Sequence, residues 1–120
     1  MEKNQELILI PKYKAYIQYT IETILRLPRT EKFSIGNDYK QIMYETLRNI
    51  LWLSKIDNSK RLYYINIIDA DLNVQRIYLR IMHENKWIND KRFYTAIDMI
   101  SEIGKIIGGL LKYYGTNIKK

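Results

Sequence analysis

The chain carries four glutamates that fall one to each predicted helical segment, a distribution that could serve metal-dependent chemistry: Glu22, Glu45, Glu84 and Glu102. A carboxylate di-iron or di-manganese site in a helical bundle requires inward glutamates and paired Glu-x-x-His motifs. None of the four glutamates begins such a motif, and Glu22, Glu45 and Glu102 lie outside the apolar stripes of their segments. The sequence therefore predicts no metal site and no cofactor.

One carboxylate pair and one histidine remain as candidates for acid–base catalysis. Asp98 and Glu102 share a helix face, but Lys105 follows and no apolar residues surround them, so we expect an exposed charged surface. His83, the single histidine, lies at the edge of a polar strip, where we expect it to be solvated or hydrogen-bonded rather than a ligand or base. The chain has no cysteine, which excludes thiolate catalysis and cysteine-based zinc sites. We predict that the protein is not an enzyme.

The basic residues are more informative than the acidic ones. Twenty Lys and Arg residues against 13 Asp and Glu give a net charge of +7, which suits a polyanionic partner, most often nucleic acid. The alternative is a Lys-, Asn- and Ile-rich composition inherited from an AT-rich genome. The outer face of the segment 35–56 carries Lys40, Tyr44, Arg48 and Lys55 at helical spacing. Cations interleaved with an aromatic residue suit a nucleic-acid backbone, and the tyrosine can stack on an exposed base.

Six further cations complete the predicted contact set for nucleic acid or a polymerase. They lie in the connection after the first segment, on the third segment and at the start of the fourth: Arg29, Lys32, Arg76, Arg80, Lys91 and Arg92. The alternative for the whole set is a solvated charged surface. For Arg76 and Arg80 a further alternative is a salt bridge to Asp69 or Glu84 across a subunit interface.

Helices must position these residues, because the apolar residues follow a 3.6-residue period and show no sustained strand alternation. In a single domain spanning 1–120, helices are expected at about 11–26, 35–56, 60–86 and 91–114, with Pro11 in the first turn, Ser34 as an N-cap and Gly115 as the last stop. Short connections make neighbouring helices antiparallel, so we predict an all-α, up-down-up-down antiparallel four-helix bundle. With no membrane span and no secretory signal recognisable, a cytoplasmic protein is expected.

The third segment carries more apolar surface than one bundle can cover. Its core stripe consists of Ile65, Ile68, Leu72, Leu79 and Met82, and a second stripe on the far side consists of Tyr63, Ile67, Ala70, Val74, Ile77, Tyr78 and Ile81. Because each helix of a lone four-helix bundle buries one stripe, we predict a homo-oligomer that assembles through the second stripe. The alternative is a third helix buried unusually deep within one subunit. Gly104 and Gly108 of the fourth segment are expected to allow close backbone approach to a neighbouring helix, and both are predicted to lie in the oligomer interface.

Four stretches resemble one known family in order along the chain. Residues 102–112 (EIGKIIGGLLK) resemble the EIGRMLGGWLK ending of the four-helix-bundle Avd-like proteins, and residues 27–36 (LPRTEKFSIG) resemble their FPKxxRFxLG segment. Residues 72–81 look like that family's leucine- and arginine-rich third helix, and residues 88–93 resemble the start of its fourth. The ending is the most specific of the four.

Two residues depart from the family pattern. Leu110 replaces the usual tryptophan of the ending, and Lys32 replaces an arginine, which keeps the charge but loses bidentate phosphate geometry. These departures leave the resemblance in fold intact.

The resemblance implies a function as well as a fold. One branch of the family comprises the accessory variability determinants of diversity-generating retroelements, homopentameric barrels that bind the reverse transcriptase and engage its template RNA during mutagenic reverse transcription. For this chain the resemblance thus implies a homopentamer without catalytic residues, whose partners are a retroelement reverse transcriptase, template RNA and, as a further candidate, cDNA. The alternative is an oligomeric scaffold, or a protein of the second branch, which is encoded in intervening sequences of 23S ribosomal RNA genes and has no retroelement role.

Overall fold

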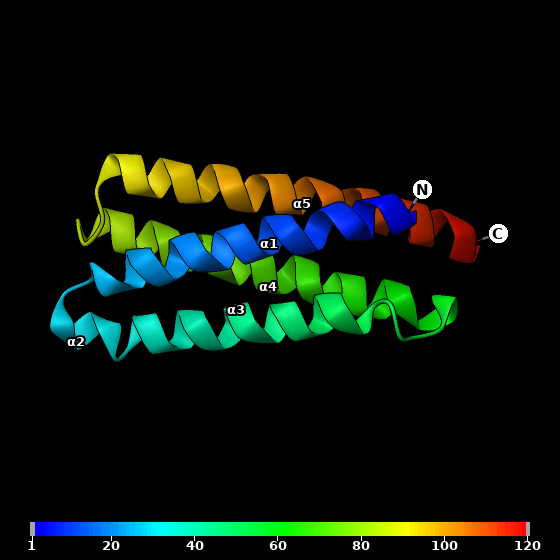
Figure 1. The fold of residues 1–120 in the computed structure, drawn as a ribbon, viewed down its shortest axis with the longest axis horizontal. Helices are drawn as coiled ribbons and strands as arrows, with labels where there is room; N and C mark the ends of the chain where they lie inside the picture. Colours follow the sequence, from blue (N-terminus) through cyan, green and yellow to red (C-terminus); the bar gives the residue numbers. More distant parts are fainter. Residues whose placement is uncertain (1, 120) are drawn as a thin grey trace.

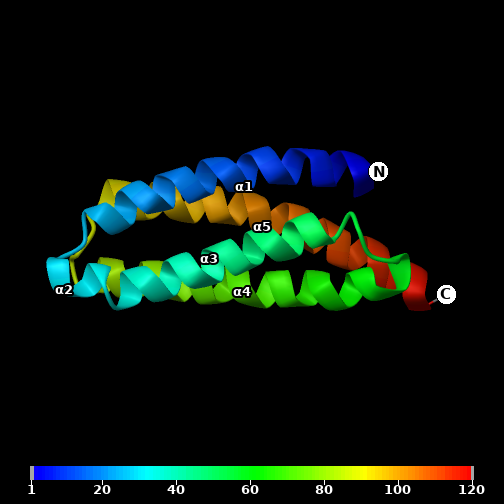
Figure 2. The same ribbon diagram turned by 60° about the horizontal axis from the view of Figure 1, so that its bottom comes forward.

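The computed structural model describes the backbone of residues 2–119 and the side chains of residues 8–115. That part of the chain is helical with short connections and contains no strand: α1 (Glu2–Leu25), α2 (Arg29–Lys32), α3 (Ile35–Trp52), α4 (Asn58–Glu84) and α5 (Asp90–Lys119). Successive long helices run in opposite directions and pack side by side, and α5 returns to pack against α1 (Figure 1 and Figure 2). The predicted all-α, up-down-up-down four-helix bundle is confirmed, with α2 as an added short turn at one end.

The bundle is a rod 49 Å long with a cross-section of 23 × 22 Å. The α1–α2–α3 corner and the α4–α5 connection lie at the same end of the rod, and the α3–α4 connection lies at the opposite end (Figure 1). Within the described helices, no stretch is both long enough and apolar enough to cross a membrane.

Helix α1 begins earlier than its sequence pattern predicted. Pro11 was expected in the first turn, but the helix begins at Glu2 and Pro11 lies inside it. Leu9 is fully buried, so the apolar face continues past the proline and core packing favours the additional turns. Proline removes one backbone hydrogen bond from a helix, and here its ring lies on the exposed side, away from the core. The predicted start of this helix was therefore wrong.

Two other predictions about helix ends were also wrong. Gly115 does not end the last helix, which continues to Lys119, and no described glycine has the positive φ of a glycine C-cap. Helix α3 ends at Trp52 rather than near residue 56, and the next residue, Leu53, is buried in the core. Ser34 holds the N-cap position of α3, as predicted, but its side chain makes no capping bond. The short helix α2 brings Glu31 within reach, and the Ser34 Oγ donates to its carboxylate at 3.1 Å.

The connection between α4 and α5 contains a residue in the left-handed backbone conformation. Lys86 has a φ of 62°, a positive value that no other described non-glycine residue has. Its N–H donates to the His83 carbonyl and the N–H of Trp87 donates to the Met82 carbonyl, each at 2.9 Å, which is the Schellman pattern of a helix end. Glycine is usual at this position because a Cβ atom strains the left-handed conformation.

A buried polar layer interrupts the apolar core where α1, α3 and α4 meet. At its centre is Gln75, a fully buried residue on the core side of α4. Its Oε1 accepts a hydrogen bond from the Tyr16 hydroxyl at 2.8 Å, and its Nε2 donates to the Tyr13 Oη and the Thr46 Oγ1 at 3.3 Å each. One amide therefore ties three helices together.

The hydroxyl groups of this layer have defined directions because each carries a single hydrogen. Tyr16 uses its hydrogen on Gln75, so Tyr39 donates in the short contact between the Tyr39 and Tyr16 hydroxyls. The hydroxyls of Tyr13 and Thr46 in turn donate to backbone carbonyls of α3 at 2.7 and 2.8 Å. Burial raises the pKa of all three tyrosines, so each remains a protonated donor at neutral pH.

Candidate nucleic-acid interface

The first group of cations lies on the outer face of α3. Tyr44 and Arg48 are exposed, and Lys40 is half-buried one turn before Tyr44. Lys55 follows the end of the helix and is also exposed. Trp52, which the sequence reasoning did not include, is 47% exposed one turn after Arg48 and adds a second aromatic ring to the same stripe. Helical spacing thus places Lys40, Tyr44, Arg48 and Trp52 along one side of α3, and their contact with nucleic acid stays a prediction.

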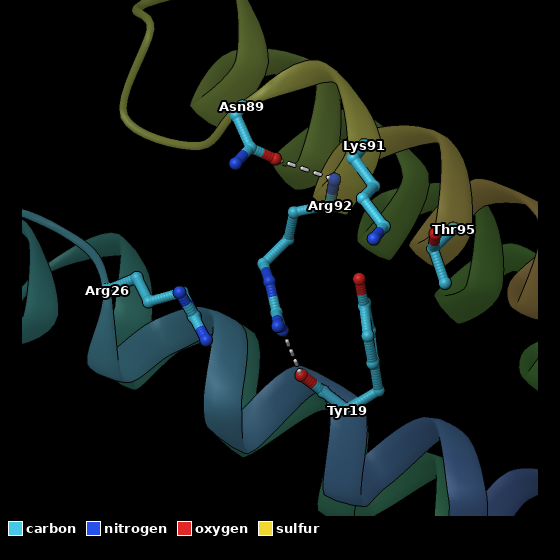
Figure 3. A pocket seen from close by; sticks show the side chains of 6 residues that line it. All are labelled: Tyr19, Arg26, Asn89, Lys91, Arg92 and Thr95. Atoms are coloured by element: carbon cyan, nitrogen blue, oxygen red, sulfur yellow. Dashed lines mark hydrogen bonds between the residues drawn. The ribbon is translucent and has the colours of Figure 1, made fainter.

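The second group surrounds a pocket between the end of α1 and the start of α5. This pocket has a volume of about 420 Å³, and its lining residues are shown in Figure 3: Tyr19, Arg26, Asn89, Lys91, Arg92 and Thr95. Arg29 and Lys32 of α2 lie at the same end of the bundle (Figure 1). Sequence reasoning selected Lys91 and Arg92 but missed Arg26 and Tyr19, because nothing local in the sequence indicates that α1 and α5 meet here.

Contacts within the chain hold Arg92 in place. Its guanidinium carbon lies 4.2 Å from the centroid of the Tyr19 ring, a cation–π distance. Its Nη1 donates to the Thr23 Oγ1 at 3.0 Å and, more weakly, to the Tyr19 carbonyl at 3.4 Å. Its backbone N–H donates to the Asn89 Oδ1 at 2.8 Å, so Asn89 caps the first turn of α5. This predicted contact residue therefore also joins α5 to α1.

The third group consists of Arg76 and Arg80 on α4. Arg80 is exposed, whereas Arg76 is half-buried and its Nη1 donates to the Asn73 Oδ1 at 2.6 Å. The other terminal nitrogen of Arg76 fills the space where a Cβ atom on Gly104 would lie. Within the chain, Gly104 thus makes room for the Arg76 side chain, and the predicted close approach of a neighbouring helix backbone is not found there. At Gly108 no heavy atom outside its own stretch of helix lies within 4 Å of the corresponding position, so this glycine faces open space within the chain. That both glycines lie in the oligomer interface stays a prediction.

Comparison with known proteins places this fold in a family. The sequence pattern of the bAvd-like family matches residues 7–114. The chain belongs to the bAvd-like family. The bundle is also similar to a crystal structure of a protein of unknown function from the S23 ribosomal protein family of Bacteroides thetaiotaomicron VPI-5482. The TM-score is 0.81 and the sequence identity is 14%, and the match covers 90% of this chain and 98% of that chain. At this identity the likeness shows a shared fold. No curated protein matches the chain significantly.

In this bAvd-like chain the second apolar stripe of α4 is largely uncovered. Tyr63 is 65% exposed, Ile77 is 48% exposed and Val74 is 37% exposed. Ala70 is exposed as well, and the remaining members of the stripe are half-buried: Ile67, Tyr78 and Ile81. Helix α4 is therefore not buried unusually deep within one subunit, and the surplus apolar face predicted from the sequence is present. The partner that covers it stays a prediction.

The acidic and histidine candidates do not converge in the described part of the chain. No three or more acidic or histidine side chains among the described residues are grouped to hold a metal ion. Glu102 pairs with Lys12 on the surface at 2.9 Å, and this hydrogen bond lowers the pKa of the carboxyl group. The His83 Nε2 lies 2.7 Å from the Asp90 Oδ1, and its ring stacks on Phe93 with 4.1 Å between centroids. His83 is thus hydrogen-bonded, as predicted.

Proposed function

We propose that this bAvd-like protein is a non-catalytic accessory subunit of a diversity-generating retroelement, which binds the reverse transcriptase and its template RNA during mutagenic reverse transcription. The observation that carries the proposal is the arrangement of its cations on exposed surfaces: Arg48 and Lys55 project from the α3 side, and Arg29 and Lys91 from one end of the bundle. Phosphate contacts of this kind supply most of the affinity for nucleic acid without reading its sequence. Membership of the bAvd-like family supports the proposal, because the resemblance to Avd-like proteins implies a retroelement context.

The proposal includes assembly into a homo-oligomer through the uncovered face of α4. Ile77 and Tyr63 expose apolar surface that water solvates unfavourably, and a second copy would remove it from water. Five copies, the number implied by the resemblance, would carry five times +7, or +35 formal charges. Pooled charge of this size attracts a polyanion over long range. Assembly would thus strengthen the binding of RNA.

Assembly is tested by Ile77→Asp, measured by analytical ultracentrifugation at micromolar concentration. Because Ile77 is half exposed in the single chain, the variant keeps its helical circular dichroism but sediments as a monomer. A wild-type protein that sediments as a monomer would refute the assembly.

RNA binding is tested by the salt dependence of affinity for a structured RNA. Each phosphate neutralised contributes about −0.7 to −0.9 to the slope of log K against log salt concentration. We expect a steep negative slope with little preference among RNA sequences. A flat response would exclude the electrostatic mechanism.

The binding surface is tested by the triple variant Lys40→Glu, Arg48→Glu and Lys55→Glu. A matched control reverses three exposed lysines away from α3: Lys14→Glu, Lys105→Glu and Lys112→Glu. Both variants lose the same net charge, so a purely long-range effect would weaken binding equally. We expect the α3 variant to lose binding to RNA or to the reverse transcriptase and the control to lose much less. Undiminished binding of both partners by the α3 variant would favour the alternative, an oligomeric scaffold or an intervening-sequence-type protein.

A further inference from the structure

The pocket between α1 and α5 has the electrostatics of an anion site. Its walls carry the cations Arg26, Lys91 and Arg92, and no carboxylate is among its lining side chains (Figure 3). The nearest acid in sequence, Asp90, is engaged by His83 at 2.7 Å. It lines an adjoining hollow on the α4–α5 side, which shares Asn89 and Lys91 with the pocket. Cations that share one hollow repel one another unless an anion neutralises them. The pocket is therefore most stable when an anion occupies it.

The Arg92 guanidinium is held in a fixed orientation with part of its donor set unused. Both of its side-chain hydrogen bonds to α1 are made by Nη1. Nε and Nη2 have no hydrogen-bond partner among the described residues, and stacking on Tyr19 fixes the plane in which they lie. A guanidinium presented in this way matches the oxygens of a phosphate group and loses little side-chain entropy on binding.

The other lining groups add charge and neutral donors around the same space. Arg26 and Lys91 are exposed, and neither has an ion pair with another described residue. In Figure 3 the Lys91 amine and the Tyr19 hydroxyl point into the space beside Arg92. Thr95 contributes a further hydroxyl group to the wall. Donors from several directions suit a tetrahedral anion better than a planar carboxylate.

We infer that this pocket binds a phosphate group of a nucleic-acid strand, an inference that rests on the proposed function and names the ligand chemistry of one site within it. The volume of about 420 Å³ exceeds the size of a bare phosphate and leaves room for the attached sugar. The short helix α2, which carries the cations Arg29 and Lys32, lies at this end of the bundle (Figure 1). A nucleic-acid strand places phosphates at regular spacing and can contact both the pocket and α2, whereas an acidic peptide offers planar carboxylates.

The test removes the two free cations and leaves Arg92 in place, because Arg92 also joins α5 to α1. The variant Arg26→Gln, Lys91→Gln is compared with Lys14→Gln, Lys105→Gln, which loses the same charge at exposed positions elsewhere. The probes are a single-stranded oligoribonucleotide with a 5′-phosphate, the same strand with a 5′-hydroxyl, and inorganic phosphate. Binding is measured by fluorescence anisotropy for the strands and by NMR of the Arg92 Nε–H for inorganic phosphate.

The pocket variant is expected to weaken binding of the strand roughly tenfold and to reduce the salt slope by about 1 to 2, whereas the control changes affinity less than about threefold. Inorganic phosphate is expected to shift the Arg92 Nε–H resonance saturably in the wild-type protein and not in the pocket variant. Preference for the 5′-phosphorylated strand identifies a terminal phosphate as the ligand, and equal binding of the two strands identifies an internal phosphodiester. Both outcomes support the inference.

The experiment distinguishes a wrong assignment of the pocket from a wrong proposed function. If the pocket variant and the control lose affinity for the strand equally, or neither loses affinity, the inference that the pocket binds a phosphate group is overturned, while RNA binding by the protein itself stands. If the wild-type protein binds neither strand, the proposed function fails, and so does the assignment of the pocket to a nucleic-acid strand. Tighter binding of polyglutamate than of RNA at the pocket would assign it to an acidic protein and overturn the inference.

Discussion

The buried polar layer allows a comparison in which the same atom is removed from two tyrosines with different consequences. Tyr16→Phe and Tyr39→Phe each delete one hydroxyl group from a fully buried ring. Tyr16 both accepts from Tyr39 and donates to Gln75, whereas the hydroxyl of Tyr39 bonds to Tyr16 in this layer. Tyr16→Phe therefore leaves the Tyr39 hydroxyl and the Gln75 Oε1 without these partners, while Tyr39→Phe leaves Tyr16 still bonded to Gln75.

The expected losses of stability follow from this difference. Removing one buried hydrogen bond without leaving an unsatisfied group costs about 0.5 to 1.5 kcal/mol, which is the estimate for Tyr39→Phe. Each buried polar group left unsatisfied costs about 1 to 3 kcal/mol. Tyr16→Phe leaves two such groups without these partners, so its expected loss of stability is about 2 to 6 kcal/mol. We expect Tyr16→Phe to be the more destabilising variant by at least about 0.5 kcal/mol.

The assay is urea unfolding followed by circular dichroism at 222 nm. All proteins are compared at one concentration, because the proposed assembly would make apparent stability depend on concentration. Equal m-values would indicate that the two variants change stability and not the compactness of either state. Losses that are equal, or a larger loss for Tyr39→Phe, would refute the directions assigned to these hydrogen bonds.

Three further predictions concern pH and backbone conformation. Burial holds the pKa of Tyr13, Tyr16 and Tyr39 above the ordinary value near 10, so these tyrosines lose their protons in the unfolded chain before they do in the folded one. The free energy of unfolding is therefore unaffected below about pH 10. Above that pH it falls by up to about 1.4 kcal/mol per pH unit for each tyrosine. Part of the tyrosinate absorbance at 295 nm should then appear only as the helical signal is lost; complete ionisation of a folded protein would contradict this. Gly108→Ala should raise stability by up to about 1 kcal/mol in thermal unfolding, because the new methyl group meets open space in the chain and alanine favours a helix. A loss of oligomer mass in this variant would instead place Gly108 against a partner subunit. Lys86→Gly should stabilise the protein by about 0.5 to 1 kcal/mol, because glycine relieves the strain of the left-handed backbone conformation. Lys86→Ala keeps a Cβ atom and should not stabilise the protein. Equal effects of the two substitutions would show that Lys86 is not strained.

The sequence by itself determined the helices, their antiparallel order and the excess of apolar surface on α4. These features depend on local spacing, since a 3.6-residue period defines a face without reference to the rest of the chain. Ile65 and Leu72 are buried as their spacing indicates, and Ile77 remains exposed as the second stripe required. The positions of helix ends were less predictable, because packing of Leu9 and Leu53 outweighed the local signals of Pro11 and the predicted caps.

Only the tertiary structure decided which polar groups meet. Gln75 occupies a core position of α4, a signal visible in the sequence, but its partners lie 29 to 62 residues away and depend on the register and rotation of three helices. The same holds for Arg92, which contacts Thr23 across 69 residues, and for Arg26, which joins the pocket only because α1 ends where α5 begins. Periodicity assigns a residue to a face, whereas the relative placement of two faces follows from how all the side chains of the core pack together.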